Sequence, residues 1–448
     1  MDSQAGLTWE MNWLGSLELN WTTEPSHGSI EKIVRRELTL SDDKFCAIEF
    51  LAEGAFNKVY IVRCQDSEDL VMRVTLPVQP HFKTMSEDAT IKYIEHHTDI
   101  PVPQVLKCSS ARDEELGYEW MLMSRVHGIS LHDQWAPMCW LSKELIVRNS
   151  VQFLTQLFKK RFTRIGNLYA TKDLQQLPTS DIPDTQLLGS EFSNKDTAFC
   201  LSQVVSIPFF WGKHVHFPAP RGPFAHSRDW LAAQLQLYML DADEPFSDPA
   251  SSSDTDDDDE PDEFSTPEAR KTRAQRLLNL LPTIFPDATE SFVLHHADLN
   301  ASNILIDPLN HTITGIIDWE CIHTVPLWSA CQTPKFLDSD YARAECPSPE
   351  KYMRDTLDDG TVVMNELYLE HLEEYEKTRL RAFFVEEMGR VCPEWVVVYR
   401  ASKLKAAFGE VVDLFGDPVV AQVLDEWIER VERDGDAPSV VDILRGDA

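Results

Sequence analysis

The stretch from residue 292 to residue 320 constrains this chain of 448 residues more than any other, because it combines a hairpin with spaced polar side chains. A short apolar run leads into a polar loop, and strands are expected at 304–306 and 312–317 around a turn that contains Pro and Asn. Two carboxylates and one amide flank this hairpin: Asp298, Asn303 and Asp318. We expect these three side chains to meet at its mouth.

The spacing of these groups matches the needs of phosphoryl transfer from Mg-ATP. That reaction needs a base to accept the proton of a hydroxyl group, and hard oxygen ligands to hold Mg²⁺ against the phosphates. Asp298 stands five residues before Asn303, and Asp318 follows the second strand. The alternative is a surface hairpin with ordinary turn residues, which the complete pattern disfavours.

A family resemblance rests on two motifs in this stretch. The sequence H-A-D-L-N-A-S-N from His296, followed by I-I-D-W-E from Ile316, resembles the aminoglycoside phosphotransferase and choline-kinase-like family of small-molecule kinases, and most closely its fungal-type branch. The resemblance implies a protein-kinase-like fold with ATP and Mg²⁺ as cofactors. It implies that Asp298 is the catalytic base and that Asn303 and Asp318 are the Mg²⁺ ligands, while His296 braces the loop.

A loop near the start of the expected first lobe is a candidate for phosphate binding. Two strands, at 48–51 and 59–62, flank the sequence A-E-G-A-F-N-K. A hairpin loop with one glycine lets backbone N–H groups approach phosphates closely, although one glycine more often marks only a turn. In the family context Gly54 and Asn57 belong to a loop that resembles the ATP-covering loop. The chain contains no G-x-x-x-x-G-K-[ST], which argues against a P-loop NTPase.

The third strand and the helix after it suggest an ion pair. Strand 70–74 carries Arg73 where kinases place the lysine that binds the α- and β-phosphates, and an arginine fork also suits phosphate. In the expected helix 83–97, Glu87 lies in line with apolar positions, so we expect Arg73 as its partner. A solvated helix glutamate is the alternative.

The strand at 118–124 is expected to lead into the connection between the lobes. In kinases the adenine ring contacts this connection, so Met123 and Ser124 are candidate nucleotide contacts. A run of Met and Leu is also typical of plain core.

Length and pattern favour a bilobal α+β fold. We expect an N-terminal extension at 1–44, a kinase-like lobe at 45–125 with a small antiparallel sheet and one main helix, and a larger, mostly helical lobe at 126–448. The extension is expected to pack against the first lobe. The acidic segment 242–267 is expected to be a disordered insertion, because it offers little apolar surface.

Charge and composition exclude several function classes. The net charge is −33, from 41 basic and 74 acidic residues, which disfavours nucleic acid as a partner and favours a cationic substrate. The chain contains no run of 18 consecutive apolar residues, so no membrane span is expected. The N-terminus lacks the pattern of a signal peptide, and the nine cysteines form no CxxC pair, which predicts reduced thiols in a cytoplasmic protein.

The expected function is ATP- and Mg²⁺-dependent phosphorylation of a hydroxyl group on a small molecule. In such kinases the substrate is usually recognised by the C-terminal region, where helices are expected at 364–375, 377–390, 394–408 and 419–433. The alternative is a nucleotide-binding pseudokinase that acts as a scaffold. Arg73 in place of lysine and the single glycine favour that alternative, whereas the complete set of Asp298, Asn303 and Asp318 favours the enzyme.

Overall fold

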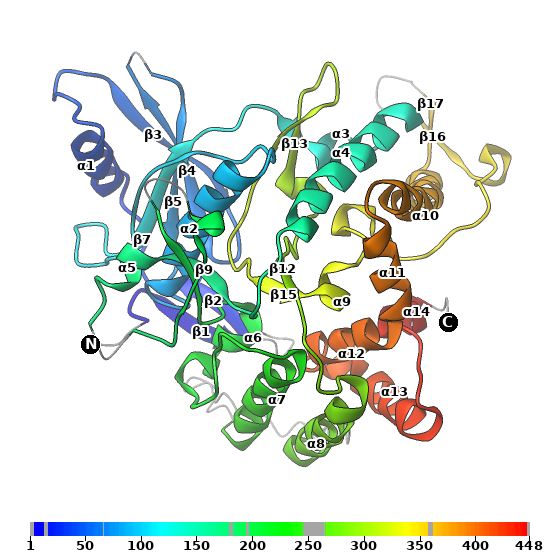
Figure 1. The fold of residues 1–448 in the computed structure, drawn as a ribbon. Coiled ribbons are helices and arrows are strands. Elements are labelled where there is room, and N and C mark those ends of the chain that lie inside the picture. The colour runs from blue at the N-terminus through cyan, green and yellow to red at the C-terminus, as the bar shows by residue number, and fades with distance from the viewer. Residues whose placement is uncertain are drawn as a thin grey trace, which may run out of the picture.

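The computed structural model divides the chain into two lobes (Figure 1). It describes residues 4–12, 17–65, 67–178, 182–193, 197–244, 264, 266–356 and 362–445. The first lobe, drawn in blue and cyan, contains the largest sheet, and the second lobe is mostly helical. This is the α+β, two-lobed architecture that the sequence predicts.

The sheet of the first lobe has five strands in the spatial order β3-β4-β5-β7-β6. Their bounds are β3 Cys46–Glu53, β4 Asn57–Cys64, β5 Leu70–Thr75, β6 Val105–Ser109 and β7 Glu119–Ser124. All neighbours are antiparallel. Because side chains alternate along a strand, Trp120 and Leu122 of β7 enter one hydrophobic cluster and Met121 and Met123 enter another. Both faces of the sheet are therefore covered.

The central strand β5 sets the position of Arg73. Met72 and Val74 are fully buried in the cluster on one face, as the alternation predicts. Arg73 points to the opposite face, toward helix α2 (Phe82–His97). The helix packs on this face through Ile91 and Ile94, which share a cluster with Met121 and Met123 of β7.

The N-terminal extension packs on the first lobe. It forms a hairpin of β1 (Leu7–Met11) and β2 (Leu17–Trp21), followed by helix α1 (His27–Glu37). The sequence predicts the packing of this extension on the first lobe but not its hairpin. Ile30, Ile33 and Val34 of α1 are buried among the side chains of the sheet.

The second lobe contains many short elements around a few long helices. Its helices are α3 Leu131–Gln134, α4 Trp140–Lys159, α5 Thr171–Leu174, α6 Ile207–Phe210, α7 Ser227–Asp243, α8 Pro267–Ile284, α9 Leu327–Ala330, α10 Glu366–Val391, α11 Pro393–Ala401, α12 Lys403–Asp413, α13 Ala421–Asp434 and α14 Val440–Arg445. Its strands are β8 Ile129–Ser130, β9 Asn167–Ala170, β10 Gln186–Leu187, β11 Phe199–Ser202, β12 Phe292–Leu294, β13 Ile304–Ile306, β14 Ile313–Ile316, β15 Thr324–Pro326, β16 Arg354–Thr356 and β17 Val362–Met364.

The predicted hairpin is present as β13 and β14, and it forms a three-stranded sheet with β8. Strand β12 precedes it and pairs with β15 rather than with the hairpin. All three residues of β12 are buried, and the bounds of β13 and β14 agree with the predicted strands within one residue. The loop between β12 and β13 is thereby anchored at both ends.

Two helix predictions near the C-terminus are wrong in their boundaries. Helix α10 runs without a break where two helices are predicted, because no Pro or Gly interrupts residues 366–388. The helix predicted at 394–408 is divided into α11 and α12 at Ser402. The division lets Trp395 of α11 join one hydrophobic cluster while Phe408 of α12 joins another.

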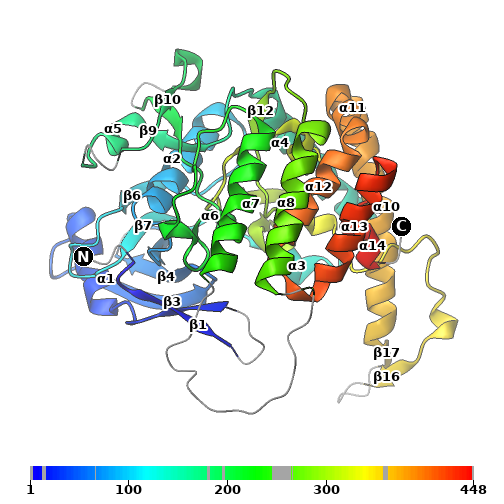
Figure 2. The ribbon, with the colours of Figure 1, turned by 90° about the horizontal axis from the view of Figure 1, so that it is seen from below.

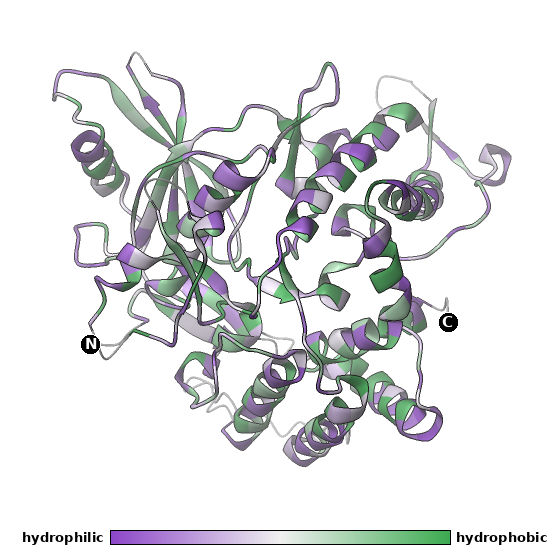
Figure 3. Ribbon diagram, in the orientation of Figure 1, coloured by the Kyte–Doolittle hydropathy of each residue, from purple (hydrophilic) through white to green (hydrophobic). Residues whose placement is uncertain are grey.

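A separate hydrophobic cluster supports the far end of the second lobe. Helices α7, α8, α12 and α13 contribute most of its residues, and Figure 2 shows α7, α8 and α13 close together. In Figure 3 these helices carry hydrophobic residues along one side and hydrophilic residues along another. This is the pattern expected of helices that pack on a core on one side and face water on the other.

The predicted acidic insertion begins and ends in helices. Residues 242 and 243 belong to α7, and α8 begins at Pro267, so the prediction of disorder is wrong at these edges. Residues 245–263 and 265 lie outside the described part of the chain. Within the described ranges, no helix has the length and apolar character needed to cross a bilayer.

The packing of α1 predicts that the N-terminal extension contributes to stability. Replacing Ile33 by Ala leaves a cavity at a site with no solvent exposure, so the free energy of unfolding should fall by about 2–5 kcal/mol. The neighbouring Lys32 is 70% exposed, and Lys32→Ala should change stability by less than about 1 kcal/mol. Urea denaturation measures both, and equal effects of the two variants would contradict this role of α1.

Candidate active site

The loop after β12 holds Asp298 with two amide side chains. Asn300 accepts the backbone N–H groups of Ser302 and Asn303 at 2.8 and 3.1 Å, and its Nδ2 donates to Asp298 Oδ2 at 3.0 Å. Asn303 Nδ2 donates to the Asp298 carbonyl at 2.9 Å and to Asp298 Oδ2 at 3.1 Å. Asp298 is thus oriented by its own loop, while its side chain remains 49% exposed.

Buried aromatic residues connect this loop to the end of the hairpin. His296 Nε2 lies 3.1 Å from the carbonyl oxygen of Ile317, and its ring meets Trp319 edge-on at 4.7 Å. Burial lowers the pKa of His296 to about 4, so the ring is neutral near pH 7. Trp319 Nε1 donates to the Ile316 carbonyl at 2.9 Å. His296 therefore braces the loop, as the family resemblance implies.

Asp318 stands at the end of the hairpin in a left-handed backbone conformation, with φ of 65°. This conformation is uncommon for a residue other than glycine and persists where the surroundings fix it. Asp318 Oδ1 lies 3.4 Å from Arg73 Nη1 of the first lobe. Burial and the neighbouring Glu320 raise the pKa of Asp318 to about 6.

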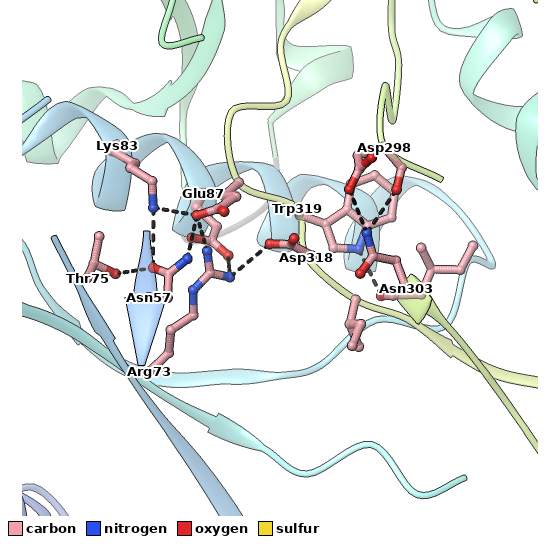
Figure 4. A network of polar contacts seen from close by, with 12 residues as sticks. Asn57, Arg73, Thr75, Lys83, Glu87, Asp298, Asn303, Asp318 and Trp319 are labelled. Carbon is pink, nitrogen blue, oxygen red and sulfur yellow. Dashed lines mark hydrogen bonds and ion pairs between the residues drawn. The ribbon is translucent and has the colours of Figure 1, made fainter. Parts of the chain in front are cut away.

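Beside Asp318 lies a group of polar contacts that we call the buried ion cluster, which consists of Asn57, Arg73, Lys83, Glu87 and Glu320. The first four residues are buried and are labelled in Figure 4, and the side chain of Glu320 is 14% exposed. Arg73 Nη1 contacts Glu87 and its Nη2 contacts Glu320, so the predicted Arg73–Glu87 pair is present. Lys83 also contacts Glu320. The side chains of Arg73, Lys83 and Glu87 are at most 8% exposed.

Asn57 connects the charged groups of the buried ion cluster through its amide. Its Nδ2 donates to Glu320 Oε2 at 2.7 Å. Its Oδ1 accepts Lys83 Nζ at 3.3 Å and Thr75 Oγ1 at 2.9 Å. Asn57 is buried and fully engaged here, so the structure places it in this cluster and not in an open loop above it.

The charges around Arg73 leave an excess of negative charge. Arg73 and Lys83 face three carboxylates, those of Glu87, Glu320 and Asp318. Burial alone would raise the pKa of Glu320, but Lys83 and Arg73 outweigh it and hold that pKa at about 2. Burial raises the pKa of Glu87 to about 7 even beside Arg73. A cation near Asp318 would relieve this excess.

The donor set around Asp318 fits Mg²⁺. Asn303 gives its N–H groups to Asp298, so Oδ1 is the atom of its side chain that can bind a metal ion. The N–H of Ile317 donates to the Asn303 carbonyl at 3.0 Å, which brings Asn303 beside the residue before Asp318. The described residues form no group of three or more His, Cys, Asp or Glu suited to a metal. An open site with one carboxylate suits Mg²⁺, whose other ligands are commonly phosphates and water.

The residues predicted to bind nucleotide lie along the first lobe. Gly54 begins the turn between β3 and β4, and its N–H donates to Asn57 O at 2.9 Å. A Cβ added to this glycine would meet nothing within 4 Å. Its backbone is not left-handed, so the fold alone does not require glycine there. We still predict that Gly54 leaves space for the nucleotide phosphates to approach the backbone closely.

Met123 and Ser124 lie at the end of β7. The Met123 side chain is buried in a hydrophobic cluster, and the Ser124 N–H donates to the Gln104 carbonyl at 2.9 Å. Ser124 Oγ accepts the Gln104 N–H at 2.8 Å. Their contact with an adenine ring stays a prediction, and it would have to use groups other than this N–H.

Sequence reasoning missed four residues of the site: Lys83, Asn300, Glu320 and Lys335. Lys83 had a usable signal, because a lysine in the first turn of a helix opposes the helix dipole and needs a carboxylate nearby. Asn300 also had one, since Asn caps helical turns. Glu320 and Lys335 had none, because their partners are far away in the sequence.

The architecture and the family agree. The five-stranded sheet with α2, the mostly helical second lobe and the site between them define a protein-kinase-like fold. The chain belongs to the phosphotransferase enzyme family, whose model matches residues 47–329 and so more than half of the chain. The family resemblance of the two motifs is thereby confirmed.

Curated relatives are distant. A subtelomeric hrmA-associated cluster protein of Aspergillus fumigatus is 26% identical over 331 residues, which are 66% of this chain and 61% of that protein. The chain thus spans about three fifths of the length of that relative. The mitochondrial protein called altered inheritance of mitochondria protein 9 of Meyerozyma guilliermondii is 26% identical over 158 residues, which are 33% of this chain and 25% of that protein.

Similar solved structures include two aminoglycoside phosphotransferases. The apo form of a thermostable mutant of APH(4)-Ia has a TM-score of 0.42 and 14% identity, covering 91% of this chain and 99% of that chain. ADP-bound APH(2'')-Ib has a TM-score of 0.44 and 10% identity, covering 90% of this chain and 97% of that chain.

The buried ion cluster predicts a large effect of Lys83 on stability. Lys83→Met removes one partner of Glu320 and leaves the remaining carboxylates buried with a single cation. Breaking a buried ion pair in this way should lower the free energy of unfolding by about 3–5 kcal/mol. Urea denaturation measures it.

Lys271→Met is the matched control. Lys271 also contacts one carboxylate, that of Asp243, but its side chain is 34% exposed and that of Asp243 is 57% exposed. The control should lose no more than about 1 kcal/mol. A Lys83→Met protein as stable as the control would show that the cluster does not hold the lobes together.

Proposed function

We propose that the protein transfers the γ-phosphoryl group of ATP to a hydroxyl group of a small molecule. The observation that carries the proposal is the arrangement of Asp298, Asn303 and Asp318 around one hairpin. Asn303 orients Asp298 through its side-chain N–H groups, and its backbone carbonyl accepts the N–H of Ile317, the residue before Asp318. One amide thus connects a candidate base with a candidate metal site.

The chemistry follows from the position of each group. Asn303 and Asp318 would hold Mg²⁺, which neutralises charge on the phosphates when it is bound. Asp298 accepts the proton of the acceptor hydroxyl while the hydroxyl oxygen bonds to the γ-phosphorus. The bond from that phosphorus to the bridging oxygen breaks, and ADP leaves. Arg73, fixed by Glu87 and Glu320, would contribute its positive charge near the nucleotide phosphates from the first lobe, although its terminal nitrogens already contact carboxylates.

Membership of the phosphotransferase enzyme family supports this function class. The net charge of −33 disfavours nucleic acid as the acceptor, so a small molecule is the substrate class that we propose. A screen of hydroxyl-bearing metabolites and antibiotics for ATP-dependent gain of one phosphoryl mass would identify it. We place the reaction in the cytoplasm, because all nine cysteines are free thiols.

A nucleotide-binding protein without turnover is the second candidate function. The contacts of the Arg73 guanidinium favour this second candidate. Both terminal nitrogens of Arg73 already contact carboxylates, so they are not free to bind phosphate. The enzyme is favoured by the exposed and well-oriented Asp298, since a scaffold needs no such base. Turnover measurements distinguish the two.

The role of Asp298 predicts a separation of chemistry from binding. Asp298→Asn keeps the shape of the side chain but removes the base, so phosphoryl transfer or ATP hydrolysis should fall by roughly 10²- to 10⁴-fold while Mg-ATP binding is retained. Nucleotide titration and single-turnover assays measure the two quantities.

Asp307→Asn is the control for this substitution, because Asp307 lies in the same hairpin and only caps its turn, accepting the N–H groups of Leu309 and Asn310. It should leave the rate unchanged. Full activity of Asp298→Asn would contradict the assignment of the base.

The role of Asp318 predicts a metal-dependent binding defect. Asp318→Ala removes the carboxylate ligand of a doubly charged ion, so the affinity for ATP in Mg²⁺ should fall by at least about tenfold. In EDTA the variant and the wild type should bind ATP equally weakly. Calorimetric titration under both conditions checks this, and a defect of the same size in EDTA would mean that Asp318 acts on folding rather than on metal binding.

A further inference from the structure

A short segment of the second lobe places a lysine next to Asp298. Lys335 begins a 3₁₀ turn at Lys335–Leu337, and the N–H of Phe336 donates to the carbonyl of Leu299 at 2.9 Å. Phe336 and Leu337 are buried, so they anchor the turn in the core. This backbone bond joins the residue after Asp298 to the residue after Lys335, and it fixes the two positions relative to each other.

The lysine occupies one of the two oxygens of the candidate base. Lys335 Nζ lies 3.0 Å from Asp298 Oδ1, while Oδ2 accepts the amides of Asn300 and Asn303. Oδ1 is therefore the oxygen to which an acceptor hydroxyl can donate once the ammonium shifts aside. The Lys335 side chain is 55% exposed, so it has room to move.

The ammonium group of Lys335 lies where the γ-phosphoryl group would pass during transfer. An acceptor hydroxyl must lie about 3 Å from the base, and its oxygen about 3–3.5 Å from the phosphorus it attacks. An ammonium that reaches Asp298 Oδ1 consequently reaches the phosphoryl oxygens as well. Those oxygens carry the negative charge of the transition state, and cations beside them accelerate phosphoryl transfer.

The other cations of the site are already committed. Arg73 and Lys83 are buried and contact Glu87 and Glu320. Among the described residues, Lys335 forms an ion pair with Asp298. Both side chains are about half exposed, and an exposed ion pair of this kind contributes little to folding stability. A structural purpose therefore does not explain why buried anchors hold Lys335 at this point.

We propose that Lys335 is a catalytic residue that binds the γ-phosphoryl group as it passes from ATP to the acceptor. This inference rests on the proposed phosphotransferase function. In the resting site the ammonium pairs with Asp298. When ATP and an acceptor bind, the ammonium turns to the γ-phosphoryl oxygens and frees Oδ1, which then takes the hydroxyl proton. Lys335 keeps its own proton throughout.

The test uses the full-length protein with water as the acceptor, so that no substrate needs to be known. Lys335→Met should lower the rate of Mg-ATP hydrolysis on the order of 10²-fold. It should bind a non-hydrolysable ATP analogue several-fold more weakly, while ADP affinity and melting temperature stay as in the wild type. Lys335→Arg, which keeps the charge, should recover much of the rate.

Lys32→Met is the matched control. Lys32 is an exposed lysine on α1, and its Nζ lies 3.1 Å from a carboxylate oxygen of Glu115. It should behave as the wild type in every assay. The inference is overturned if Lys335→Met hydrolyses ATP at the wild-type rate, if its melting temperature falls enough to account for the loss, or if Lys335→Arg is as slow as Lys335→Met. A wild type that binds no nucleotide would instead overturn the proposed function, and this inference with it.

Discussion

The contact between Arg73 and Glu320 is the interaction on which the site depends, because it joins the two lobes inside the protein. Arg73 belongs to β5 of the first lobe, whereas Glu320 follows the hairpin of the second. The same guanidinium contacts Glu87 of α2, so one side chain fixes a strand, a helix and a hairpin. Buried charges are costly when a partner is lost, so the lobes are held here in one arrangement.

Lys83 explains how one arginine can serve two glutamates. Without it, Arg73 alone would face the carboxylates of Glu87, Glu320 and Asp318 in a site with little water. Lys83 lies in the first turn of α2, where the helix dipole opposes a positive charge. Its contacts with Glu320 and Asn57 offset that cost, and the contact with Glu320 also connects α2 to the second lobe.

Local features of this fold could be predicted from the sequence, and contacts between distant segments could not. The strands of the hairpin and the orientation of Arg73 on β5 follow from side-chain periodicity over a few residues. The pair of Arg73 with Glu87 is expected from the line of Glu87 with apolar helix positions together with the place that kinases give these two residues. The partners of Glu320 depend on how the lobes dock, which no local pattern encodes. The N-terminal hairpin was missed for the same reason, since Trp9 finds its partner in Trp211 at 5.0 Å.

The distribution of charge around Arg73 bears on the metal ion that we propose beside Asp318. Arg73 and Lys83 are outnumbered by the three carboxylates around them, so this side of the site carries net negative charge before any nucleotide arrives. In the proposed reaction ATP would bring further negative charge to the same place, while both terminal nitrogens of Arg73 already contact carboxylates. In the proposed enzyme a divalent cation beside Asp318 would offset part of this charge, because Arg73 and Lys83 already pair with carboxylates that join the lobes.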